Sequence, residues 1–235
     1  MKARRIYLVG PRASGKTTVG RELAARLGWR FVDTDELVVR GAGCSVAEIV
    51  RRQGWEAFRD METAALRAVC DAPCLVVATG GGMVLREENR LLLAESGLTA
   101  WLRVSADALV ARLCADPLHE QRPALASADE EGGPGLPDSP HVSISPGVPD
   151  SPGSPDSPGS PDLPVSPIPS TPSALSGTQN TPAAAVSREV EEVLAARVPL
   201  YAAVAHITVD GEKNVQEITE YLVKFLETKG HTSLD

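Results

Sequence analysis

The sequence predicts a three-layer α/β/α fold, in which helices cover both faces of a five-stranded parallel sheet. Five short apolar runs alternate with segments of helical periodicity along the chain, which is the pattern of repeated β-α units. The first apolar run leads into a glycine-rich turn and then a helical segment, and the alternation resumes after a long proline-rich stretch. We therefore expect a single domain formed by residues 1–125 and 186–235, interrupted by residues 126–185.

Each element is predicted by a local pattern. Short apolar runs predict buried strands, in order, at residues 5–9, 30–36, 74–79, 99–104 and 205–210, the second leading into a loop. Apolar residues that recur every third or fourth position predict helices at residues 18–28, 46–53, 55–70, 87–97, 106–115, 188–198 and 215–230. Ser45, with Glu48 three residues later, and Ser187 are expected helix caps. Glycines are expected to end the first two helices, at Gly28 and Gly54.

Residues 126–185 differ in composition from the rest of the chain. They hold 14 of the 19 prolines and seven acidic residues, but no Lys, Arg or aromatic residue. Such a segment buries too little apolar surface to offset the loss of chain entropy, so we expect disorder with polyproline character. Within it, "VPDSPGSPDSPGSPDLP" repeats a unit every six residues. Because strands and helices alternate on both sides, the segment is interpreted as an insertion rather than an interdomain linker.

The net charge of -8 comes mostly from this insertion, and the rest of the chain carries about -1. A nearly neutral domain is not typical of proteins that bind nucleic acid. The four cysteines lack a paired metal-binding spacing and are expected to be reduced thiols in or near the core. The first apolar run is too short for a signal peptide, and none reaches membrane-spanning length. We expect a cytoplasmic monomer that binds neither membrane nor nucleic acid.

The segment "GPRASGKT" matches the pattern G-x-x-x-x-G-K-[ST] and lies between an expected strand and an expected helix. Backbone N–H groups of such a loop point at an anion, the lysine neutralises nucleotide phosphates, and the hydroxyl binds Mg²⁺. The motif predicts a nucleoside triphosphate, and ATP is favoured because we find no guanine-reading N-K-x-D pattern. The residues expected at the nucleotide are Ala13, Ser14, Gly15, Lys16, Thr17 and Thr18.

Two further groups follow strands at the same expected edge of the sheet. Asp33 and Asp35 share one side of an extended chain, so one suits the metal water shell and the other an acceptor hydroxyl. Alternatively, Asp35 only caps a helix that begins at Glu36. The run Gly80–Gly82 allows the backbone to approach a ligand closely, although a plain turn is the alternative.

Three arginines, Arg59, Arg122 and Arg197, stand out in the nearly neutral domain. A planar guanidinium can make two parallel hydrogen bonds to a carboxylate, which a lysine cannot. Arg59 with Glu62 three residues later could also be an ordinary exposed helix pair, and Arg197 could be solvated.

The segments "GPRASGKT", "DTD", "FRDME", "TGGG", "RPAL" and "RVPLY" stand in this order along the chain. Together they resemble the motifs of the shikimate kinases, and the resemblance covers residues 5–125 and about 185 to the end. It implies a P-loop kinase fold and ATP-dependent phosphorylation of the 3-hydroxyl of shikimate. On the nucleotide side it implies that Lys16 holds the β- and γ-phosphates, and that Thr17 and, through water, Asp33 hold Mg²⁺. Arg122 would close over the phosphates from the lid, and Arg112, a looser match, would lie against adenine.

On the acceptor side, the resemblance implies that Asp35 orients the hydroxyl and accepts its proton. Arg59 and Arg197 would bind the shikimate carboxylate, and the run Gly80–Gly82 would contact the ring hydroxyls. Positioning and charge would perform most of the catalysis, with Lys16 and Arg122 beside Asp35 as the catalytic groups.

The insertion is the main departure from the family pattern, because it falls in the lid that follows R-P-x-L. It would be tolerated disorder or, through its P-x-x-P spacing, a partner-binding segment. Two other functions stay open. One is a different small-molecule kinase, such as a gluconate or nucleoside monophosphate kinase. The other is a nucleotide-binding module without catalysis, although the residues that would carry chemistry are all intact.

Overall fold

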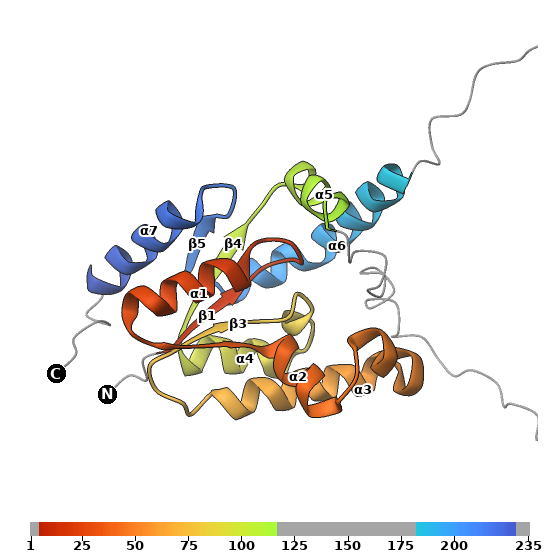
Figure 1. The fold of residues 1–235 in the computed structure, drawn as a ribbon, viewed down its shortest axis with the longest axis horizontal. Helices are drawn as coiled ribbons and strands as arrows, with labels where there is room; N and C mark the ends of the chain where they lie inside the picture. The colour runs from red at the N-terminus through yellow and green to blue at the C-terminus, as the bar shows by residue number, and fades with distance from the viewer. Residues whose placement is uncertain (1–4, 117–181, 229–235) are drawn as a thin grey trace, which may run out of the picture. The chain divides into compact units, whose positions relative to one another are not determined.

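The computed structural model describes residues 5–116 and 182–228, which form helices packed on both sides of one parallel sheet (Figure 1). Five strands are hydrogen-bonded in parallel, in the order β2-β3-β1-β4-β5. The last strand in the chain pairs with β4, so the segments before and after residues 117–181 build the same sheet. This confirms the predicted three-layer fold with a five-stranded parallel sheet. The strands are β1 (Arg5–Val9), β2 (Arg30–Asp33), β3 (Leu75–Ala78), β4 (Leu98–Arg103) and β5 (Ile207–Asp210).

The helices divide between the two faces of the sheet. One face is covered by α1 (Lys16–Leu27) and α7 (Val215–Thr228), and the other by α3 (Val46–Val69), α4 (Glu87–Ser96) and α6 (Pro182–Val204). The remaining helices pack on other helices: α2 (Thr34–Ala42) on α3 and α5 (Ala106–Cys114) on α6. Within the described residues, none of these helices has both the length and the apolar character needed to cross a membrane.

The central strand β1 shows why both faces need cover. Ile6 and Leu8 point to the face with α1 and α7, whereas Tyr7 and Val9 point to the face with α3, α4 and α6. All four are essentially inaccessible to solvent. A strand that alternates between two apolar layers reads in sequence as one continuous apolar run, as "RIYLV" does.

The structure corrects the prediction at the end of β2. Helix α2 begins at Thr34, where a loop was expected, and Asp33 is its N-cap: the Asp33 carboxylate accepts a hydrogen bond from the Asp35 N–H at 3.0 Å. Asp35 therefore lies in the first helical turn, and it is neither in an extended chain beside Asp33 nor the cap of the helix. The short polar side chain of Asp33 satisfies an N–H that would otherwise lack a partner, so the helix begins one residue after the strand.

The other expectations have mixed outcomes. Gly54, with φ 80° and ψ 171°, divides α3 as predicted, and Ser45 caps that helix by accepting from Glu48 N–H at 3.3 Å. Helix α6, however, begins at Pro182, so Ser187 is not its cap and residues 182–185 of the expected insertion are helical. The cysteines are free as expected, but Cys114 is exposed rather than near the core. The expected disorder of residues 126–181 lies outside the described residues.

Gly20 lets α1 pack closely on β2. A Cβ atom at this position would lie 2.5 Å from Cε2 of Phe31 and 3.2 Å from Cδ1 of Leu8. We expect Gly20→Ala to lower the free energy of unfolding by about 1–3 kcal/mol, because overpacking outweighs the better helix propensity of alanine. Gly41→Ala in α2 is the matched control, since its Cβ would meet no atom within 4 Å. Urea unfolding of both variants checks this, and equal stabilities would contradict it.

Candidate active site

The phosphate loop, residues 10–17, connects β1 to α1. Its glycines are required by the backbone: Gly10 has φ 146° and Gly15 has φ 93°, and a Cβ on Gly10 would lie 2.8 Å from the carbonyl oxygen of Leu102. Ala13 also has a positive φ, 62°, which is unusual for a residue with a Cβ. The loop therefore holds a costly conformation at a helix N-terminus, where free N–H groups and the helix dipole favour an anion.

Lys16, the first residue of α1, is buried beneath the loop. Its Nζ donates to the carbonyl oxygens of Gly10 at 2.9 Å and Pro11 at 2.6 Å. Burial lowers the pKa of Lys16 to about 8, an effect that the carboxylates of Asp35 and Asp33 oppose. The lysine is thus a cation held against the loop and close to both aspartates.

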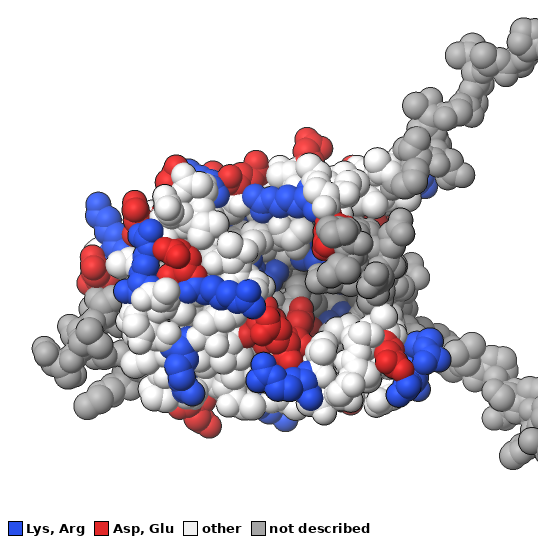
Figure 2. Space-filling view, in the orientation of Figure 1, with Lys and Arg blue, Asp and Glu red and all other residues white. Residues whose placement is uncertain are grey.

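A cavity of about 470 Å³ lies over the loop. Of the residues expected at the nucleotide, all those within the described part of the chain line this cavity. Arg112 of α5 crosses it and donates to the carbonyl oxygens of Ala13 at 3.2 Å and Gly211 at 2.9 Å. Its far wall comes from the connection after β5, including Lys213 and Val215, which the sequence did not single out. These residues could have been predicted to line the site, because they follow a parallel strand and the ends of parallel strands meet at the edge of the sheet that carries the phosphate loop. Figure 2 shows one face of the molecule with a central hollow, basic side chains at its floor and acidic side chains on its rim.

Thr17 and Asp33 form a candidate metal site beside the loop. The Thr17 hydroxyl donates to Asp33 Oδ2 at 2.7 Å, so an oxygen from α1 and a carboxylate from the end of β2 are in direct contact. Hard oxygen ligands of this kind suit Mg²⁺. The described residues contain no group of three or more His, Cys, Asp or Glu that could hold a metal alone. This donor set therefore fits a Mg²⁺ ion that takes its other ligands from phosphate and water.

Two carboxylates meet at the first glycine after β3. A Cβ on Gly80 would lie 2.5 Å both from Oδ1 of Asp35 and from Oε1 of Glu62, so both carboxylates lie against its backbone. The Gly80 N–H donates to the Thr34 hydroxyl at 2.9 Å, which joins the glycine run to the start of α2. Asp35 itself is exposed. Position 80 therefore requires glycine because the two carboxylates approach its backbone closely, and not only because the chain turns there.

Arg59 and Glu62 form a buried ion pair on α3, with side chains only 7% and 2% exposed. The alternative of an exposed helix pair is therefore wrong. The Arg59 guanidinium also lies over the ring of Trp55, 5.3 Å from its centroid. A Cβ on Gly82 would overlap the same guanidinium. The arginine is thus confined between α3 and the glycine run.

Glu62 has a perturbed environment that the sequence did not reveal. Burial raises the pKa of Glu62 to about 7, against the lowering effects of Arg59 and Arg197, while the Asp35 carboxylate raises it further. Its signals in the sequence were the spacing of three from Arg59 and its place at the end of the segment "FRDME".

Arg197 on α6 is 2% exposed, so it is not solvated. Its charge acts on the pKa of both Lys16 and Glu62, so it lies within electrostatic reach of the phosphate loop and of the Arg59–Glu62 pair. The structure thus brings together Lys16, Asp35 and two arginines far apart in the chain. Arg122, the remaining predicted site residue, lies outside the described residues.

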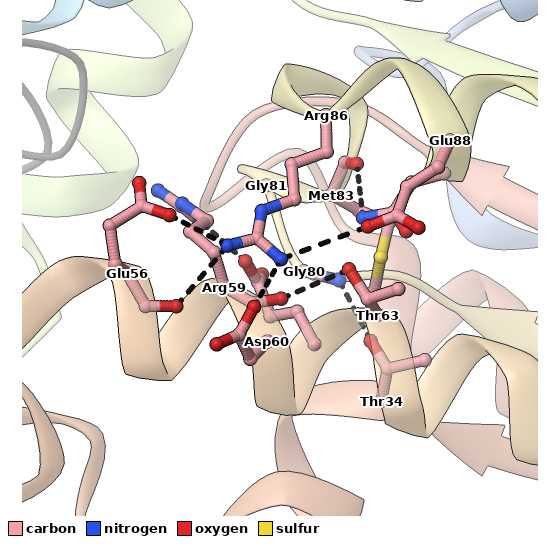
Figure 3. Close-up of polar contacts among 12 residues, drawn as sticks. Thr34, Glu56, Arg59, Asp60, Thr63, Gly80, Gly81, Met83, Arg86 and Glu88 are labelled. Atoms are coloured by element: carbon pink, nitrogen blue, oxygen red, sulfur yellow. Dashed lines mark hydrogen bonds and ion pairs between the residues drawn. The ribbon is translucent and has the colours of Figure 1, made fainter. Parts of the chain in front are cut away.

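The glycine run is tied to α3 by Arg86, which precedes α4 (Figure 3). Its guanidinium donates to Asp60 Oδ1 at 2.6 Å and to Glu56 Oε2 at 2.8 Å. Asp60 and Glu56 flank Arg59 on α3, and Arg86 is four residues after Gly82. This bridge joins the segment that follows the run to the turn of α3 that carries Arg59.

A parallel sheet in the order found here, with the phosphate loop between its central strand and a helix, defines a P-loop kinase. The family model for shikimate kinase matches residues 12–133. A shikimate kinase 2 from Yersinia enterocolitica is 35% identical over 221 residues, which are 94% of each chain. The chain belongs to the shikimate kinase family.

Other known proteins agree with this assignment. A shikimate kinase from Nitratidesulfovibrio vulgaris is 57% identical over 129 residues, covering 54% of this chain and 74% of the relative. The solved shikimate kinase from Acinetobacter baumannii, in complex with shikimate, has a TM-score of 0.66 at 24% identity, covering 96% of this chain and 93% of that one. The enzyme from Bacteroides thetaiotaomicron also has a TM-score of 0.66, at 22% identity, covering 95% and 98%. At these identities the two structures support the fold.

Proposed function

We propose that the protein transfers the γ-phosphate of ATP to the 3-hydroxyl of shikimate, giving shikimate 3-phosphate and ADP. The observation that carries this proposal is the convergence of Arg59 from α3 and Arg197 from α6 with Asp35, next to Lys16 of the phosphate loop. Two buried guanidinium groups beside Asp35 and Glu62, a carboxyl group whose pKa is raised to about 7, suit a small hydroxy acid that brings its own negative charge.

On the nucleotide side, Lys16 and the loop N–H groups would bind the β- and γ-phosphates. Arg112 would lie along the nucleotide, since it spans the cavity from the loop to the β5–α7 connection. Thr17 and Asp33 would hold Mg²⁺, which when bound supplies positive charge to the phosphate oxygens. Arg122 would close over the phosphates. The protein's part is thus to fix the terminal phosphate in place and to neutralise its charge.

On the acceptor side, Arg59 and Arg197 would hold the carboxylate of shikimate and so set the direction of its ring. Asp35 would accept a hydrogen bond from the 3-hydroxyl and take its proton as the oxygen attacks phosphorus. Within the described part of the chain, neither Gly81 nor Gly82 has a hydrogen-bond partner for its backbone N–H. These two donors are proposed to bind ring hydroxyls.

An assay of ADP release tests the proposal. The purified protein with ATP and Mg²⁺ should release ADP when shikimate is added, and ³¹P NMR should show a new phosphate monoester. Gluconate and nucleoside monophosphates serve as competing acceptors. Turnover of one of them without turnover of shikimate would point to a different small-molecule kinase. Tight ATP binding without release of ADP for any acceptor would point to a nucleotide-binding module.

Shikimate should bind more weakly as the pH rises through 7. Glu62 has a folded-state pKa raised from 4.5 to about 7, so it ionises late, and its charge then competes with the substrate carboxylate for Arg59. By the same linkage, its contribution to folding stability falls between about pH 4.5 and 7. We expect the Kd for shikimate to rise by about threefold to fourfold from pH 5.5 to 7.5, because a group with a pKa of about 7 passes from almost fully protonated to mostly ionised over this range.

Calorimetric titration with shikimate, without ATP, measures this dependence. Asp35 and Arg197 are the other charged groups that act on Glu62, and neither is changed in the control variant, Glu62→Gln. That variant should bind shikimate with little dependence on pH. A wild-type Kd that stays flat, or one that falls with pH, would contradict the prediction.

We also propose that residues 1–125 and 186–235 form one interrupted catalytic domain, whose second segment is extended to residue 182 by α6. The β4–β5 pairing supports this, because it joins the two segments in one sheet. We propose further that the enzyme is a cytoplasmic monomer with no nucleic-acid or membrane partner.

A further inference from the structure

Tyr201 links α6 to the glycine run. Its hydroxyl donates to the carbonyl oxygen of Gly81 at 2.6 Å, across 120 residues of sequence. The side chain is fully buried, and its ring stacks on Trp101 with a centroid distance of 6.0 Å. Tyr201 follows Arg197 by four residues, so both side chains leave α6 on the same side. One helix therefore supplies a site arginine and a hydrogen bond to the backbone opposite it.

The other carbonyl groups near the run are held locally. The Gly80 carbonyl accepts from Met83 N–H at 3.1 Å, within the turn itself. The carbonyl oxygens of the 3-10 helix η1 (Met83–Leu85) accept from Asn89 and Arg90 of α4, at 2.8 to 3.1 Å. Tyr201 differs from these donors because it belongs to the helix that carries Arg197.

The hydrogen bond from Tyr201 affects the orientation of the whole peptide between Gly81 and Gly82. Its C=O and N–H point in opposite directions, so a held Gly81 carbonyl also fixes the direction of the Gly82 N–H. A peptide flanked by two glycines can turn over at low steric cost, because neither residue has a Cβ. The hydrogen bond from Tyr201 is therefore what selects one of the two orientations.

We propose that Tyr201 is a positioning residue for the acceptor. It holds the Gly81–Gly82 peptide so that the Gly82 N–H points to a hydroxyl of shikimate. Because Tyr201 and Arg197 belong to the same helix, the contact also fixes the position of Arg197 relative to that N–H. The inference rests on the proposed function. It assigns the relative placement of the carboxylate-binding and hydroxyl-binding parts of the site to a single phenol hydroxyl.

The test compares two tyrosines by removing one hydroxyl from each. Tyr201→Phe keeps the ring and its stacking on Trp101, and leaves the Gly81 carbonyl without its donor. Tyr7→Phe is the matched control, since Tyr7 is equally buried and its hydroxyl lies 2.8 Å from Ser96 Oγ, away from the phosphate loop. Tyr201→Phe should raise the KM for shikimate about 5- to 50-fold and leave the KM for ATP within about twofold. Tyr7→Phe should change neither constant.

The outcomes separate the possible failures. If both variants keep the shikimate KM of the unsubstituted enzyme, or if Tyr201→Phe raises both KM values alike, Tyr201 has only a structural role and the inference is wrong. If the unsubstituted protein does not phosphorylate shikimate, the proposed function fails instead. Should Tyr201→Phe not fold, amide hydrogen exchange on the unsubstituted enzyme decides. Shikimate should slow exchange at Gly82, and unchanged exchange there would overturn the inference.

Discussion

Asp35→Asn is expected to lower kcat for shikimate phosphorylation by a factor of about 10² to 10⁴, with ATP affinity retained. The carboxylate lies against Gly80 and acts on the charge of Lys16, so it stands between the acceptor backbone and the phosphate loop. Asparagine keeps the size of the side chain and one hydrogen-bond acceptor, but it cannot take the proton of the attacking hydroxyl. The loss should therefore appear in kcat more than in either KM.

Glu36→Gln is the matched control for Asp35→Asn. Glu36 is the next residue of α2, is 51% exposed, and pairs with Arg21 at 2.8 Å on the outside of the molecule. Steady-state ADP release and equilibrium ATP binding should show a normal enzyme. If Asp35→Asn retained more than about a tenth of the wild-type kcat, Asp35 would orient the hydroxyl without accepting its proton.

Arg59→Met should abolish shikimate binding and also destabilise the protein. It removes a guanidinium confined by Glu62, Trp55 and Gly82, and it leaves the Glu62 carboxyl buried without its partner. Breaking a buried pair in this way costs about 3–5 kcal/mol of unfolding free energy. Part of this loss is relieved by protonation of Glu62, because its pKa, already about 7 beside Arg59, rises further when that arginine is removed, and the variant should therefore be least stable at high pH.

A double variant separates stability from function at this pair. Replacing a buried ion pair by apolar residues is often neutral or stabilising by about 1–4 kcal/mol, so Arg59→Met with Glu62→Met should regain most of the stability. It should still fail to bind shikimate, and it should bind ATP normally. Thermal unfolding and calorimetric titration measure the two properties. Shikimate binding by the double variant would show that Arg59 does not bind the carboxylate.

The sheet and the phosphate loop could be predicted from sequence because their signals are local. A strand buried on both faces appears as an apolar run, and the loop conformation needs glycine at fixed positions. The start of α2 was missed for a local reason too: Asp33 both ends a strand and caps a helix, with no loop residue between them. A residue with two consecutive roles leaves no separate signal for either element.

The acceptor site was only partly predictable because its contacts are long-range. Arg59 and Arg197 could be named from the motif order, but their burial depends on two helices, α3 and α6, that pack on the same face of the sheet. Glu62 and Tyr201 are the last residues of the segments "FRDME" and "RVPLY", but nothing in either segment indicates what their side chains contact. Their partners, Gly80 and Gly81, become visible only when α3 and α6 are placed beside the glycine run that follows β3.

The pairing of β4 with β5 has a consequence for how the chain is made. While residues 207–210 are still inside the ribosome, β4 is an unprotected edge, and the apolar residues of α7 are missing from one side of the core. A polypeptide that stops before residue 182 would already contain the phosphate loop but would lack Arg197 and Tyr201. Such a fragment would leave the backbone N–H and C=O groups along one side of β4 open to pairing with other chains. Nascent chains of this enzyme therefore lack the Arg197 part of the acceptor site until α6 has been synthesised.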